Sequence, residues 1–169
     1  VATVQVPLIG AVTFVAGVLF FPLSYIFGDV LTEVYGYARD RRCVWAGFGA
    51  LGFAALMAAV IVALPPASWW QEEQKAVATV FGNTPRIVLA SILAFWSGSF
   101  VNSYVLAKMK IWTAGRWLWT RTIGSTLVGE GLDTAIFVVV AFAGTLPAPL
   151  LWSILVSNYV FKVGVEVAA

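Results

Sequence analysis

Two residue types that carry much of protein chemistry are nearly missing from this chain. Its 169 residues include no histidine and one cysteine, Cys43. The sequence therefore excludes disulfide bonds, thiolate clusters and histidine-based metal sites. Catalysis by a Ser-His-Asp or Cys-His arrangement is excluded for the same reason. No nucleotide-binding loop is present either, so we expect no cofactor, no bound metal and no enzymatic activity.

Charged residues are also scarce. Only 11% of the residues are Asp, Glu, Lys or Arg, whereas soluble domains carry about 25%. The net charge is +2, and no basic patch is interleaved with aromatic residues, so a nucleic-acid partner has no support. Hydrophobic residues make up 61% of the chain, which is more than a soluble core of this size needs. The composition indicates a protein whose solvent is lipid.

Long apolar runs take the place of the missing charge. A helix needs about 20 apolar residues to cross the hydrocarbon core of a bilayer. Five runs approach or exceed this length, namely Val6–Leu31, Val44–Leu64, Ile87–Ala107, Thr122–Leu146 and Pro147–Val165. We therefore expect an all-α fold, a polytopic transmembrane helical bundle, that forms one integral membrane domain over residues 1–169.

Positive charge alternates between the connections of these runs. The first connection carries Arg39, Arg41 and Arg42, and the third carries Lys108, Lys110, Arg116 and Arg121. The positive-inside rule places both in the cytoplasm, so the chain starts outside and an odd number of spans is expected upstream. One further span gives six helices in the full chain. On the outer side, Trp69–Phe81 predicts a short amphipathic helix at the membrane surface.

Charged residues inside the apolar runs are the best candidates for a functional site. Each costs about 2.5–3.5 kcal/mol near mid-bilayer, so it normally faces a cavity or a partner. Lys162 is the only cation within the five runs, and Glu130 and Asp133 lie one turn apart in the fourth run. We expect Lys162 to pair with Asp133 or Glu130. The pair either fixes the register of two helices or belongs to a substrate site.

Small residues form a ridge along the third run. Ala90, Ala94 and Gly98 recur at four-residue spacing, and Asn102 occupies the next position. Such ridges let helices approach closely in lipid, where van der Waals packing drives association. The ridge predicts that Asn102 points into the bundle. Its amide then either bonds a neighbouring helix or contacts a ligand.

Four ordered blocks carry a family resemblance. They read FPLSYIFGDVLTEVYGYARDRR, WSGSFVNSYVLAKMK, WLWTRTIGSTLVGEGLDTAIF and SNYVFKV, and they extend from Phe20 to Val163. The chain resembles the queuosine precursor transporter family, also called the vitamin uptake transporter family. The resemblance implies a six-helix protein of a bacterial or archaeal cytoplasmic membrane. It also implies uptake of 7-deazaguanine precursors of queuosine, such as preQ0 or preQ1.

The chemistry of a 7-deazaguanine suggests roles for the polar residues. Its ring presents two N–H donors beside a carbonyl, a pattern that a carboxylate and an amide can bind. We expect Glu130 or Asp133 to bind the donor edge, Asn102 to bind the carbonyl, and Lys162 to supply the counter-charge. Aromatic side chains are expected to stack on the ring. The candidates for this wall are Phe95, Trp96 and Tyr25, with Asp29 on the cavity floor.

Glu33 has a different expected role, because it lies near the cytoplasmic end of the first run. We expect it to brace an inner gate by pairing with the basic connection of Arg39, Arg41 and Arg42. The energy source stays open at this point. The chain is expected to act alone as a carrier, or as the substrate-binding subunit of an energy-coupling-factor importer. A structural membrane subunit is the further alternative. Apart from this choice, a homo-oligomer is a possible assembly of the chain.

Overall fold

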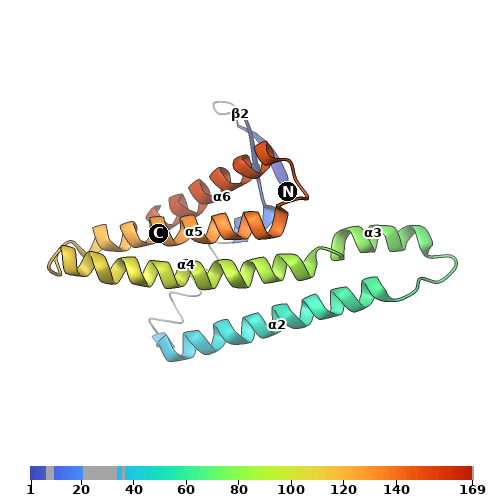
Figure 1. The fold of residues 1–169 in the computed structure, drawn as a ribbon, viewed down its shortest axis with the longest axis horizontal. Coiled ribbons are helices and arrows are strands. Elements are labelled where there is room, and N and C mark those ends of the chain that lie inside the picture. Colours follow the sequence, from blue (N-terminus) through green and yellow to red (C-terminus); the bar gives the residue numbers. More distant parts are fainter. Residues whose placement is uncertain (7–9, 21–33, 36, 169) are drawn as a thin grey trace. The chain divides into compact units, whose positions relative to one another are not determined.

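The computed structural model describes residues 1–6, 10–20, 34–35 and 37–168. The chain divides into two compact units, which Figure 1 shows in sequence colours. One unit comprises Val1–Phe27 and Leu93–Ala169, and the other comprises Gly28–Ile92. The boundary between Ile92 and Leu93 lies within one helix, so that helix contributes to both units. The expectation of a single domain stays a prediction.

Four predicted spans are confirmed as long helices. They are α2 (Tyr37–Ala63), α4 (Thr84–Trp112), α5 (Leu118–Phe142) and α6 (Ala148–Ala168). Within the described residues, four helical stretches are long and apolar enough to cross a membrane: Arg41–Ala63, Gln71–Trp112, Trp119–Phe142 and Ala148–Val165. The predicted class, a multi-pass helical membrane protein, is confirmed.

The first predicted span is wrong over its described part. The chain forms strands β1 (Ala2–Val6) and β2 (Gly10–Phe14), which pair antiparallel with Ala2 opposite Phe14 and Val6 opposite Gly10. A 3-10 helix, η1 (Ala16–Phe20), follows. The reason is local, since ATVQV and GAVTF are rich in β-branched residues, which favour strands. Run length alone did not distinguish this pattern from an apolar helix.

The connection between α5 and α6 sets where the site helices end. α5 stops at Phe142, four residues before the predicted end, because Gly144 takes a left-handed backbone with φ of 78°. The Thr145 hydroxyl and backbone N–H both donate to the Phe142 carbonyl oxygen, at 2.7 and 3.0 Å. Pro147 then directly precedes α6. This tight connection returns α6 along α5.

The unit that contains the site is held together by α6. This helix packs against α5 on one side and against β2 on another. The buried residues Ile154 of α6 and Val138 and Thr134 of α5 lie in its core. Asn158 of α6 is buried as well, and its Oδ1 accepts the Val15 backbone N–H at 3.2 Å. Asn158 therefore fixes the end of the β1–β2 hairpin to α6.

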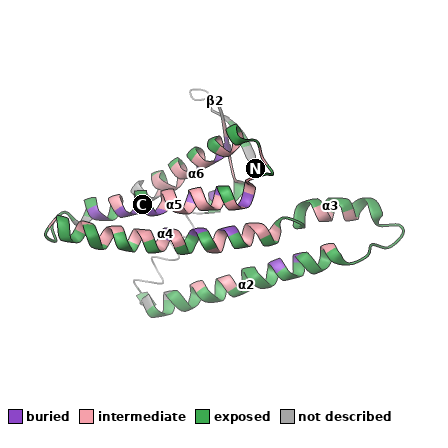
Figure 2. Ribbon diagram, viewed as in Figure 1, coloured by how far each residue is buried: buried purple, intermediate pink, exposed green. Residues whose placement is uncertain are grey.

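The second unit consists of α2, α3 (Gln71–Phe81) and the start of α4. Pro65 and Pro66 stop α2, and α3 confirms the predicted short helix. The Gln74 amide donates to the carbonyl oxygens of Val62 and Ile61 at 3.4 and 3.5 Å, in the last turn of α2. Figure 2 shows that most residues of α2 and α3 are exposed. The exposed apolar side chains of α2 suit a lipid environment.

Candidate functional site

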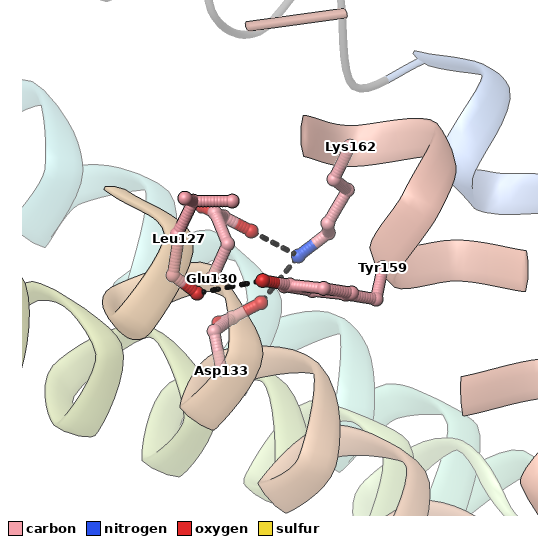
Figure 3. Close-up of polar contacts among 5 residues, drawn as sticks. All are labelled: Leu127, Glu130, Asp133, Tyr159 and Lys162. Atoms are coloured by element: carbon pink, nitrogen blue, oxygen red, sulfur yellow. Dashed lines mark hydrogen bonds and ion pairs between the residues drawn. The ribbon is translucent and has the colours of Figure 1, made fainter. Parts of the chain in front are cut away.

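The predicted pairing of Lys162 is confirmed, and it involves both carboxylates. Lys162 Nζ of α6 lies 3.0 Å from Glu130 Oε2 and also pairs with Asp133 Oδ2, both on α5. Figure 3 shows the ammonium group between the two acidic side chains. The side chains of Lys162, Glu130 and Asp133 are only 15%, 17% and 19% exposed. We call these three residues the carboxylate–lysine cluster.

The sequence places this cluster by simple helical geometry. Glu130 and Asp133 are three residues apart, so they share one face of α5. α6 packs on that face and brings Lys162 to it. In a low-dielectric surrounding, an ion pair is stable only when its partners are close and further hydrogen-bonded. One ammonium group with three N–H donors can serve both carboxylates at once.

Tyr159 borders the cluster and was not among the predicted site residues. It lies three residues before Lys162 on α6, and its hydroxyl donates to the Leu127 carbonyl oxygen at 3.1 Å. Figure 3 shows its ring beside the lysine and the aspartate. A Cβ added at Gly131 would lie 3.5 Å from the ring, in ordinary contact. The spacing of Tyr159 and Lys162 could have indicated this position, since residues three apart share a helix face.

Asn102 reaches the same region from α4. A Cβ built on Gly129 would lie 2.7 Å from the Asn102 Cβ, and one built on Gly98 would lie 2.8 Å from the Asp133 Cβ. The two helices therefore touch through their glycines, and the predicted orientation of Asn102 is confirmed. Its Oδ1 is buried and has no hydrogen-bond partner in the described part of the chain. A buried acceptor without a donor is uncommon and costs about 1–3 kcal/mol.

The remaining predicted site residues are Phe95, Trp96, Asp29, Tyr25 and Glu33. Phe95 and Trp96 of α4 are 37% and 54% exposed, so their stacking role stays a prediction. Asp29, Tyr25 and Glu33 lie outside the described residues. The aromatic and acidic parts of the expected cavity therefore rest on sequence alone.

The expected basic connection takes a different form. Arg39, Arg41 and Arg42 belong to the first turns of α2, which begins at Tyr37, and all three are exposed. The expectation of a loop is wrong here because arginine is a good helix former and nothing in YARDRR interrupts the helix. Their pairing with Glu33 stays a prediction.

Comparison with known proteins decides the family. Residues 15–169 match the family described as "Putative vitamin uptake transporter". The chain belongs to the vitamin uptake transporter family. The matched region includes η1 and all the helices, whereas β1 and β2 precede it. The cluster and Asn102 thus lie within the matched region.

A relative sharpens this assignment. The chain is 39% identical over 139 residues to a Bacillus subtilis (strain 168) protein described as "Probable queuosine precursor transporter". The match covers 82% of this chain and 60% of the relative, so the chain spans about 60% of the length of that protein. No solved structure matches the chain. The resemblance expected from the sequence blocks is confirmed.

Proposed function

We propose that this chain imports queuosine precursors, 7-deazaguanines such as preQ0 and preQ1, across the cytoplasmic membrane as a carrier. The observation that carries the proposal is the 39% identity to a protein described as a queuosine precursor transporter, over 82% of the chain. Four apolar helical stretches in the described residues are consistent with a membrane carrier.

The carboxylate–lysine cluster supports a role in binding the guanine edge. Adjacent N–H groups of the ring can donate to one carboxylate, as a charge-assisted pair. Lys162 is shared between Glu130 and Asp133, so it can keep one partner while a substrate takes the other. Binding is then an exchange, in which the ring replaces one of two ion pairs. Such an exchange avoids leaving any of the three charges unpartnered in the membrane.

Asn102 supports the second contact. An amide offers an acceptor and two donors, so it can bind a ring carbonyl or an N–H group. Its Oδ1 has no donor among the described residues, and the helix contact at Gly129 holds it beside α5. A ring N–H is a natural donor for this oxygen. We therefore extend the predicted role of Asn102, which was limited to the carbonyl, to include an accepted hydrogen bond.

The function is tested in cells that lack their own precursor synthesis. Expression of the full-length protein with external preQ0 or preQ1 should restore queuosine in tRNA, measured by mass spectrometry of digested nucleosides. Cells with an empty vector are the control. Absence of queuosine, with the protein present in the membrane, would contradict the proposal.

A liposome experiment separates the carrier from the alternative of an importer subunit. Purified protein in empty liposomes should carry labelled preQ0 inward without any ATPase. Binding without transport would instead identify a substrate-binding subunit of an energy-coupling-factor importer. A protein that neither binds nor carries the ring would be a structural subunit.

A further inference from the structure

Arg121 is a buried charge that the carboxylate–lysine cluster does not use. The sequence pattern predicts Arg121 in a basic connection between two helices. In the structure, α5 begins at Leu118, so Arg121 lies in the first turn of this helix. The residue is 7% exposed, and its Nε is buried without a hydrogen-bond partner. No ion pair recorded between described residues includes Arg121. A buried guanidinium group without an anion is costly.

The start of α5 adds to this excess of positive charge. Backbone N–H groups of the first turn have no partner within a helix and carry a partial positive charge. Trp117 occupies the N-cap position and makes no capping hydrogen bond through its side chain. The first turn contains no acidic residue. Helical side chains lean toward the N-terminus, so we expect the Arg121 side chain to lie near these same N–H groups.

We propose that Arg121 and the N-terminus of α5 form a binding site for a phosphate-type anion. Helix N-termini bind phosphate through backbone N–H groups, and a guanidinium group adds paired donors of matching geometry. The ligand is a lipid headgroup phosphate or a soluble phosphate, which share this chemistry. The exposed side chains of Trp112, Trp117 and Trp119 around the α4–α5 connection are typical of a membrane interface.

This site is separate from the carboxylate–lysine cluster. Arg121 precedes Glu130 by nine residues, which corresponds to about 14 Å along the helix axis and half a turn around it. The anion site therefore does not depend on the proposed transport of 7-deazaguanines. Its test measures ligand binding alone.

The test uses purified full-length protein in a neutral detergent that contains no phosphate. The midpoint of thermal unfolding is measured against increasing inorganic phosphate and, separately, against short-chain phosphatidylglycerol. Chloride at matched ionic strength is the control. A ligand that binds only the folded state raises the midpoint with concentration. We expect at least one of the two anions to raise it for the wild-type protein.

Two variants assign the effect to Arg121. Arg121→Gln should need at least a tenfold higher anion concentration for the same shift. Arg116→Gln, which removes an exposed arginine of the same connection, should stay within twofold of wild type. Arg121→Lys keeps the charge without the planar fork and should weaken binding at least threefold. Arg121→Lys also provides the test if the glutamine variant does not fold.

Each outcome has a defined meaning. A response to phosphatidylglycerol but not to inorganic phosphate identifies a lipid ligand, and the reverse identifies a soluble phosphate. Wild-type protein that responds to neither anion would overturn the proposal. A response of Arg121→Gln equal to that of wild type would overturn it as well. If the glutamine variant does not fold, the same holds for a response of Arg121→Lys equal to that of wild type.

Discussion

Helix α5 carries two buried charged sites that are balanced in different ways. Near its middle, Glu130 and Asp133 both pair with Lys162, so each of these three charges has a partner within the chain. In its first turn, Arg121 is buried and belongs to none of the recorded ion pairs of the described residues. The two proposed sites therefore differ in kind. A precursor at the cluster would displace an existing partner, whereas an anion at Arg121 would supply a partner that the described residues do not provide.

This comparison has an energetic consequence. Removing one member of a buried ion pair leaves an uncompensated charge, which destabilises a protein by about 3–5 kcal/mol. Removing a buried charge that has no partner relieves a desolvation cost instead. The two sites should thus respond to neutralisation with opposite signs. Their variants separate the two sites even before any ligand is added.

The largest expected effect is that of Lys162→Met. It leaves Glu130 and Asp133 facing each other without a cation, and should lower the free energy of unfolding by about 3–5 kcal/mol. Thermal unfolding in detergent measures the change. The matched variant Arg121→Gln should leave the unliganded midpoint equal to or above that of wild type. If both variants were destabilised equally, the contrast between the two sites would be refuted.

A triple variant controls for nonspecific damage by Lys162→Met. Glu130→Gln, Asp133→Asn and Lys162→Met together remove every charge of the cluster while keeping similar volumes. Replacing a whole buried ion cluster by neutral side chains is often close to neutral for stability. The triple variant should recover most of the lost stability but should not carry the precursor. Recovered uptake would show that the charges serve only the fold.

Gly129→Ala has the next largest expected effect. Its Cβ would lie 2.7 Å from the Asn102 Cβ and 3.1 Å from the Gly98 carbonyl oxygen, so α4 and α5 must move apart. Overpacking of this kind costs about 1–3 kcal/mol. Gly131→Ala is the matched control, because its Cβ would meet only the Tyr159 ring at 3.5 Å. Similar unfolding midpoints for the two variants would argue against close packing at Gly129.

Asn102→Leu should separate stability from binding. The substitution removes a buried oxygen that has no donor among the described residues, and should raise the free energy of unfolding by about 1 kcal/mol. It should also weaken precursor binding, because the amide is lost. Thermal unfolding and equilibrium binding on the same preparations measure the two effects. A clear loss of stability would mean that the amide serves the fold instead.

Tyr159→Phe has the smallest expected effect. It removes one hydrogen bond, from the tyrosine hydroxyl to the Leu127 carbonyl oxygen, and should cost about 0.5–1.5 kcal/mol. Lys162 keeps both carboxylates in this variant, so uptake should stay near wild type. A loss of uptake as large as that of the triple variant would place the hydroxyl in the binding site.

The sequence predicted the features that depend on helical periodicity and on scarcity of charge. With a single cation in the apolar runs, the partners of Lys162 were limited to few acidic residues. The ridge ending at Asn102 likewise predicted that this face of α4 points into the bundle, and the structure adds that it meets α5. Both predictions follow from spacing within one helix and from the cost of charge in lipid.

Other features depend on details that spacing does not contain. The segment before Ala16 is as apolar as a membrane helix, but its β-branched residues form a hairpin. Arg121 follows a basic connection, and only the start of α5 at Leu118 shows that it is buried within a helix. Tyr159 was missed because a tyrosine hydroxyl that binds a backbone carbonyl leaves no charge pattern in the sequence.

The central claim is that the carboxylate–lysine cluster binds the precursor by exchanging one ion pair. The most direct measurement is the affinity of purified wild-type protein, Glu130→Gln and Asp133→Asn for labelled preQ0 and preQ1, at equal folded fraction. The exchange predicts that at least one of the two variants loses tenfold or more in affinity, while Tyr159→Phe stays near wild type. Wild-type affinity in both carboxylate variants would contradict the claim.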